Sequence, residues 1–132
     1  MIVKVPPKDL HIIWNEVEPE IKKALDDCYT AQDILDGLIQ KRFQLFISWE
    51  DKVESAVITE IAQYPRKRIL RYFLAGGKNL DNWLEPIQKE IEQFAKNNQC
   101  DAIEVAGRKG WSKIKHEDRT YKDVGTISIR SI

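Results

Sequence analysis

The segment of this chain best suited to binding chemistry is Ala75-Gly76-Gly77-Lys78-Asn79-Leu80. It follows an apolar run and precedes a stretch with apolar residues at helical spacing, so a strand is predicted to enter a helix here through a turn. The two glycines permit unusual backbone angles, and Asn79 is a competent helix N-cap. The first N–H groups of such a helix are free and favour an anion, commonly a phosphate, beside which Lys78 adds a cation. An ordinary polar turn without a ligand is the alternative.

The residues that could bind a metal or act as nucleophiles are isolated in the sequence. His11 and His116 have no partners at metal-ligand spacing, so no metal site is expected. Cys28 and Cys100 match neither a disulfide framework nor a zinc motif, and both are interpreted as reduced thiols. The chain contains no Gly-x-Ser-x-Gly, Walker-type or His-Glu-x-x-His motif. Motifs therefore favour neither metal chemistry nor nucleotide hydrolysis.

The elements that must position the segment 75–80 are a strand and a helix. Residues 69–74 are almost all apolar, as expected for a strand that is covered on both faces. The helix is predicted from the apolar positions Leu80, Trp83, Leu84, Ile87, Ile91, Phe94 and Ala95. Upstream, residues 43–50 and 53–62 alternate with period two around the polar residues 50–52, which predicts an antiparallel hairpin.

The two ends of the chain contain further elements. Residues 1–5 predict a short strand, and Asp9 is expected to cap a helix whose apolar face reaches Leu25, with Pro19 kinking or dividing it. Thr30 and Asp33 resemble a capping box that begins a second helix. After the central helix we expect a strand at 102–105, a turn at 107–110, a helical segment at 111–115, a loop at 116–120 and a last strand at 124–132.

Composition limits the class of protein. A chain of 132 residues is expected to form one domain, 1–132, with a core of its own. Lys plus Arg and Asp plus Glu number 21 each, so no overall field attracts nucleic acid or an anionic membrane. No segment approaches the roughly 20 apolar residues that span a bilayer, and the first apolar run is too short for a signal peptide. A cytoplasmic protein without a membrane or nucleic-acid partner is therefore expected.

The predicted order of elements, β, α, α, β, β, β, α, β, α, β, indicates a mixed α/β (α+β) fold. This order and the strand–turn–helix unit at its centre resemble the GNAT acyltransferase superfamily, whose members use acetyl coenzyme A. The resemblance covers essentially the whole chain and implies a mainly antiparallel central sheet with helices on both faces. The run IEVAGRKGW, after a helix ending in QFAKNNQC, resembles small GNAT-like proteins of tailed bacteriophages and their hosts.

The resemblance implies roles for particular residues. In this family a turn with a Gln/Arg-x-x-Gly-x-Gly/Ala pattern holds the cofactor's pyrophosphate, and Ala75 to Leu80 occupy that place with two adjacent glycines but no Arg or Gln at the expected spacing. The family's tyrosine, which protonates the coenzyme A thiolate, is absent from residues 110–115, and Tyr121 is the nearest candidate. Glu60 is the candidate base for an amine substrate. The alternative interpretation of Glu60 is an exposed strand residue paired with a neighbouring Lys or Arg.

Three functions from different classes remain open on the sequence alone. The first is acetyl transfer from acetyl coenzyme A to an amine of a small molecule or a protein. The second is a GNAT-fold protein without catalysis that acts in binding or assembly, including in a phage particle. The third is a nucleic-acid module that uses the basic runs 66–71 or 108–115, against which the neutral net charge argues. Coenzyme A binding separates the first from the other two.

Overall fold

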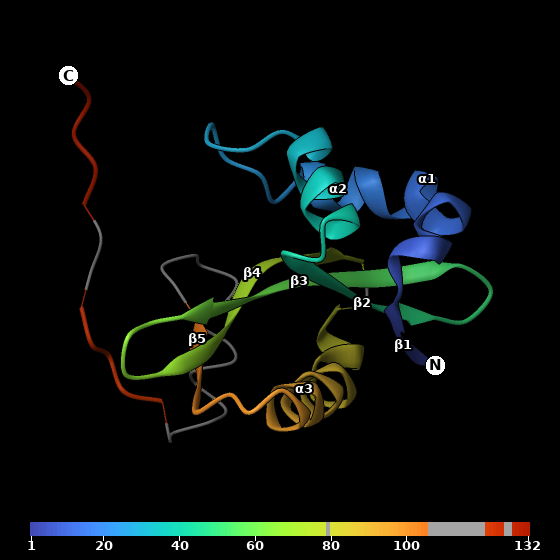
Figure 1. Cartoon of the computed structure of the whole chain (residues 1–132). Helices are drawn as coiled ribbons and strands as arrows, with labels where there is room; N and C mark the ends of the chain where they lie inside the picture. Colours follow the sequence, from blue (N-terminus) through green and yellow to red (C-terminus); the bar gives the residue numbers. More distant parts are fainter. Residues whose placement is uncertain (79, 106–120, 126–127) are drawn as a thin grey trace.

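The computed structural model describes residues 1–78, 80–105, 121–125 and 128–132 of the chain. The predicted N-cap Asn79, the turn 107–110, the helical segment 111–115 and the loop 116–120 lie outside the described residues. The prediction of a last strand is wrong for its described part, because residues 124–125 and 128–132 form no strand and run apart from the sheet (Figure 1). Val124 and Ile129 are exposed there, and no described strand lies beside them, so strand pairing does not stabilise the alternating pattern in the described residues.

A five-stranded mixed sheet forms the centre of the fold, with the strands in the spatial order β1-β2-β3-β4-β5. They are β1 (Ile2–Val5), β2 (Phe43–Trp49), β3 (Val53–Gln63), β4 (Arg68–Gly77) and β5 (Ala102–Val105). The first four pair in antiparallel order and β5 is parallel to β4. The predicted hairpin is therefore confirmed as β2 and β3, and the mainly antiparallel α/β fold class is confirmed as well.

Helices cover both faces of this sheet (Figure 1). The helices α1 (Leu10–Lys22) and α2 (Ala31–Ile39) lie on one face, and α3 (Leu80–Asn97) lies on the other. Each face buries its own apolar cluster. The cluster under α1 and α2 includes Val17, Ile34, Leu45 and Ile58, and the cluster under α3 includes Phe46, Leu70, Ile87 and Ile91. No helix among the described residues is long and apolar enough to cross a membrane.

The N-terminal helices begin in different ways. The capping box of α2 is confirmed, because the Asp33 backbone N–H donates to Thr30 Oγ1 at 3.1 Å and the Thr30 N–H donates to Asp33 Oδ2 at 2.8 Å. Asp9 precedes α1 but its side chain makes no capping hydrogen bond, since a 3-10 turn over Pro7–Asp9 already leads into the helix. Pro19 lies inside α1, which continues as one helix to Lys22 rather than dividing.

The predicted turn at the two glycines is wrong. Ala75, Gly76 and Gly77 are the last residues of β4 and lie opposite Val57, Ala56 and Ser55 of β3. β3 is 11 residues long, so its far end gives these residues a strand partner. Lys78 alone is described between β4 and the first residue of α3, so the helix N-terminus follows the strand almost directly.

Candidate site at the free edge of β4

The strand β4 continues past the end of its parallel neighbour β5. The last register pair between them joins Tyr72 to Val105. From Phe73 to Gly77, β4 pairs with β3 on one side, and no described strand lies beside its other edge. Backbone groups on such an edge are available to pair with an extended ligand. This free edge, residues 73–77, leads directly to the N-terminus of α3.

A β-bulge marks the beginning of the free edge. The register between β3 and β4 shifts between Ile58 and Thr59, which lie opposite Leu74 and Tyr72, so Phe73 is the extra residue. Tyr72 packs in the cluster under α3, whereas Phe73 and Leu74 both pack in the cluster under α1 and α2. Ala75 faces α3 again. The bulge therefore reverses the alternation of side chains for the rest of the strand.

The two glycines of the free edge are required by packing. A Cβ added to Gly76 would lie 2.5 Å from the Glu20 carbonyl oxygen in the last turn of α1. A Cβ added to Gly77 would lie 2.4 Å from the Glu54 carbonyl oxygen, and Gly77 has a φ of +132° that other residues rarely adopt. These glycines let α1 and β3 approach the end of β4, so their presence does not depend on a ligand.

A small cavity of about 270 Å³ lies where α1 ends against the free edge. Its lining joins Lys23 and Glu20 of the α1 end to Ala75, Gly76, Gly77 and Lys78. Lys23 Nζ is 3.5 Å from Glu20 Oε2, so one of the two lysines is already paired with a carboxylate. Lys78 is exposed and stands at the α3 N-terminus, where a cation and free N–H groups together favour an anion.

The first turn of α3 is hydrogen-bonded to β3. The Trp83 indole N–H donates to Glu54 Oε2 at 2.8 Å, and the Trp83 ring packs against the cluster under α3. Because Glu54 also provides the carbonyl that contacts Gly77, one residue of β3 supports both sides of the junction between β4 and α3. The helix N-terminus is thus held in a defined position relative to the free edge.

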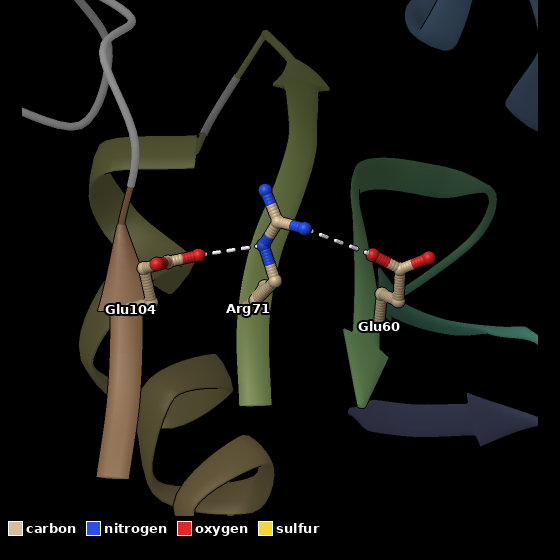
Figure 2. Close-up of polar contacts among 3 residues, drawn as sticks. All are labelled: Glu60, Arg71 and Glu104. Carbon is tan, nitrogen blue, oxygen red and sulfur yellow. Dashed lines mark hydrogen bonds and ion pairs between the residues drawn. The ribbon is translucent and has the colours of Figure 1, made fainter. Parts of the chain in front are cut away.

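Three charged side chains form a bridge across β3, β4 and β5 at the base of the free edge (Figure 2). Arg71 lies opposite Glu60 in one ladder and opposite Glu104 in the other. Its guanidinium is 3.4 Å from Glu60 Oε1 and 2.6 Å from Glu104 Oε2, although the contact with Glu104 lacks hydrogen-bond geometry. Figure 2 shows the three side chains on one face of the sheet, with α3 behind it. Glu60 is therefore paired with an arginine, as in its alternative interpretation, although its side chain is only 26% exposed.

Tyr121, the other predicted catalytic residue, lies on the opposite face. It packs against the cluster under α3, together with Tyr72 and Val105. Burial raises the pKa of the Tyr72 hydroxyl, and the nearby Tyr121 and Glu92 raise it further. The structure thus places Tyr121 near Tyr72 on the α3 side of the sheet and Glu60 on the α1 and α2 side. The two residues approach β4 from different faces rather than meeting each other.

Aromatic rings line the base of the free edge on the face of α1 and α2. The Phe73 ring lies 4.9 Å from Tyr29 in an edge-to-face arrangement and 5.1 Å from Phe43 in a stacked one. Tyr29 comes from the loop between α1 and α2, and Arg71 lies two residues before Phe73 on β4. Sequence reasoning missed Tyr29, Arg71 and Glu104 as members of this region. A parallel register between residues 69–72 and 102–105 would have been the signal for Arg71 and Glu104.

Comparison of the sequence with protein families finds no match, and comparison with curated proteins finds none either. Solved structures do match. Ribosomal-protein-alanine N-acetyltransferase from Brucella melitensis biovar Abortus 2308 has a TM-score of 0.72 at 13% identity, over 99% of each chain. AAC(6′)-Iy, in complex with the bisubstrate analogue CoA-S-monomethyl-acetylneamine, has a TM-score of 0.71 at 11% identity, over 100% of this chain and 97% of its own.

This chain has the GNAT acetyltransferase fold. An aminoglycoside acetyltransferase from an uncultured soil metagenomic sample, in complex with sisomicin, also matches it, with a TM-score of 0.66 at 14% identity over 100% of this chain and 93% of its own. The GNAT fold therefore accounts for the whole described chain. At such low identity the likeness concerns the fold, and sisomicin and the coenzyme A conjugate are ligands of those other proteins.

Proposed function

We propose that this protein is an N-acetyltransferase that moves an acetyl group from acetyl coenzyme A to an amine of a small molecule or a protein. The observation that carries the proposal is the free edge of β4, which leaves its parallel partner after Tyr72 and ends at the N-terminus of α3. An extended ligand with amide groups can pair with such an edge, and its anionic end can reach the helix N-terminus. In this chain the free edge and the helix N-terminus occur together in a GNAT fold.

The residues of this junction fit acetyl coenzyme A in three respects. The free edge offers backbone donors and acceptors along residues 73–77. Lys78 and the first N–H groups of α3, which begins at Leu80, favour phosphate groups. Gly76 and Gly77 fix the place of the junction through their packing against α1 and β3. Acetyl coenzyme A, when bound, would supply an activated thioester.

The chain's own contribution is the positioning of the amine and the removal of its proton. We assign the acceptor of this proton to Glu60, on the face of α1 and α2. Glu60, Arg71 and Glu104 together carry one more negative than positive charge, so the bridge attracts an ammonium group while Arg71 fixes the carboxylates. Tyr121, on the α3 side of the free edge, is the candidate proton donor to the leaving thiolate. A base on one face and an acid on the other can both reach an edge between them.

Calorimetric titration with acetyl coenzyme A and with coenzyme A tests the proposal. We expect saturable binding that weakens severalfold in Lys78→Ala, since this change removes the cation beside the helix N-terminus. Lys89→Ala is the matched control, because Lys89 lies on α3 and pairs with Glu85 away from the junction. Amide resonances of residues 73–77 should shift on binding. Absence of binding at millimolar ligand, by a protein whose folding is verified, would contradict the proposal.

A second candidate is a GNAT-fold protein that binds a ligand or takes part in an assembly, such as a phage particle, without catalysis. Two observations favour it. Glu60 is already paired with Arg71, and the glycines of the free edge are explained by packing. Coenzyme A binding without any acetylated product from a panel of amines would favour this candidate. Release of free coenzyme A that depends on an added amine would favour acetyl transfer.

A further inference from the structure

A second and larger concavity lies at the end of the sheet opposite the α3 N-terminus. It has a volume of about 760 Å³, which is within the range of small-molecule pockets. It surrounds the beginning of β2, where Phe43 pairs with Glu60 and no residue of β1 lies alongside. Leu38 of α2 borders it on one side of the sheet, and Phe94 and Asn98 at the end of α3 border it on the other. We call this concavity the β2 groove.

The charges that line the β2 groove are unbalanced. Four cationic side chains face it, Lys4 from β1, Lys41 and Arg42 from the turn after α2, and Arg68 from the beginning of β4. Glu60 is the one acidic side chain in its lining, and it is paired with Arg71. The chain as a whole has no net charge. The positive charge is therefore a local property of this groove, brought together by three separate parts of the chain.

The cations are held by neutral partners. Lys4 Nζ lies over the Phe94 ring at 5.2 Å, and the Arg42 guanidinium lies over the Phe43 ring at 5.4 Å. Arg68 Nε donates to the Asn98 carbonyl oxygen at 2.8 Å. Within the described part of the chain, the ion pairs include none of these three side chains, nor Lys41. These partners orient the side chains and leave the charges of Lys4 and Arg68 available to a ligand, whereas Arg42 also interacts with the Asp33 carboxylate.

The backbone at Lys41 gives a second, independent indication. Lys41 has a φ of +64° in the turn that ends α2, a position where glycine is favoured. Its N–H donates to the Leu38 carbonyl and the Arg42 N–H donates to the Gly37 carbonyl, so the turn is fixed. A lysine in this conformation is less stable than a glycine would be, and residues that break a local rule in this way are found at functional sites. Because the backbone alone would favour glycine here, we expect the side chain of Lys41 to have a role of its own.

We propose that the β2 groove binds a small organic anion with two or more negative charges, carried by phosphate or carboxylate groups. Four cations in the lining of one groove match such a ligand. The groove is a confined pocket, whereas a nucleic acid needs an extended surface with more phosphate contacts, commonly about six to ten. Under the proposed function this ligand is the amine acceptor, because Glu60 lines the same groove. Only that last assignment rests on acetyl transfer.

Titration with inorganic pyrophosphate at low salt, followed by calorimetry and two-dimensional NMR, tests the groove. We expect saturable binding, with shifts at the amides of residues 41–44. Lys4→Gln and Lys41→Gly should each weaken the affinity about fivefold, since each removes one cation from the ligand's surroundings. Lys41→Gly also relieves the backbone conformation, so it should fold at least as well as the unaltered chain. Lys89→Gln, which removes a cation on α3, should leave the affinity unchanged.

The other outcomes separate this inference from the proposed function. Pyrophosphate binding that is lost in Lys78→Ala and kept in Lys41→Gly would place the anion at the β4–α3 junction and overturn the groove assignment. Absence of binding at millimolar pyrophosphate would overturn it as well. Tighter binding of a single-stranded oligonucleotide, in competition with pyrophosphate, would replace the small anion with a nucleic acid. Failure to bind acetyl coenzyme A, with the groove's binding intact, would contradict acetyl transfer alone.

Discussion

Arg71 of β4 and Glu104 of β5 lie opposite each other in the parallel ladder, and 2.6 Å separates Arg71 Nε from Glu104 Oε2. The same guanidinium reaches Glu60 on the antiparallel side. Each of the three side chains is about one-third exposed or less, so water screens their charges only in part. The bridge therefore ties the three strands together at the point where β4 begins to leave β5.

Replacement of Arg71 by Met should leave Glu60 and Glu104 without their shared cation. We expect the free energy of unfolding to fall by about 1–2 kcal/mol, because this pair is intermediate between exposed and buried ion pairs. Urea unfolding at neutral pH measures the change. Glu104→Gln in the Arg71→Met background should recover part of the loss, and strictly additive effects of the two changes would contradict the coupling.

Gly76→Ala should destabilise the chain by about 2 kcal/mol, because the new methyl group must displace the backbone of α1. The added Cβ would lie 2.5 Å from the Glu20 carbonyl oxygen, and a backbone atom cannot move aside as a flexible side chain can. Gly125→Ala is the matched control, since nothing lies within 4 Å of the position of its Cβ. Thermal unfolding of both variants should show a clear decrease for the first and almost none for the second.

Lys41→Gly and Gln99→Gly should each stabilise the chain by about 0.5–1 kcal/mol. Both residues have positive φ values, +64° and +55°, in the turns that follow α2 and α3. Glycine adopts this conformation without steric cost. The steric cost that the substitution removes exceeds the larger loss of chain entropy that glycine suffers on folding. Chemical denaturation measures the gain. A loss of stability in both variants would show that contacts of the two side chains outweigh the backbone effect.

The stability provided by the α2 capping box should depend on pH. Hydrogen bonds from the Thr30 backbone and side chain lower the pKa of Asp33 from its usual 3.8, with a smaller contribution from Arg42. A lowered pKa in the folded chain means that the stabilisation is present above about pH 3.8 and is lost as the pH falls through the folded value. Asp33→Asn should therefore be less stable than the parent near neutral pH, and the difference should vanish in acid unfolding experiments.

Local patterns in the sequence predicted most of the fold. Period-two alternation located β2 and β3, and helical spacing located α3, because each of these elements packs one or both of its faces against a neighbour. The Thr30 and Asp33 capping box is a purely local motif and was predicted correctly. Two glycines before a helix were interpreted as a turn, yet they extend β4, because the length of β3 decides where pairing ends. The end of β4 is therefore set by the length of β3 and cannot be predicted from the local sequence around the glycines.

The candidate site was predicted less well, because its members meet through long-range register. Glu60 was chosen as a strand carboxylate, but its pairing with Arg71 depends on which residues of β3 and β4 face each other. Glu104 joins them through the parallel pairing of β5, and Tyr29 reaches Phe73 from a loop more than 40 residues earlier in the sequence. Composition also concealed the β2 groove, since a neutral chain can gather four cations in one place.

The bulge at Phe73 and the glycine at position 76 depend on each other. In a regular strand, position 75 would face α1 and position 76 would face α3. The extra residue exchanges these two positions, so it is Gly76 that meets the Glu20 carbonyl while the Ala75 methyl group turns toward α3. If the strand lost the bulge but kept all its residues, Ala75 would be pressed against the backbone of α1. A relative that lacks the bulge should therefore have its small residue one position earlier along β4.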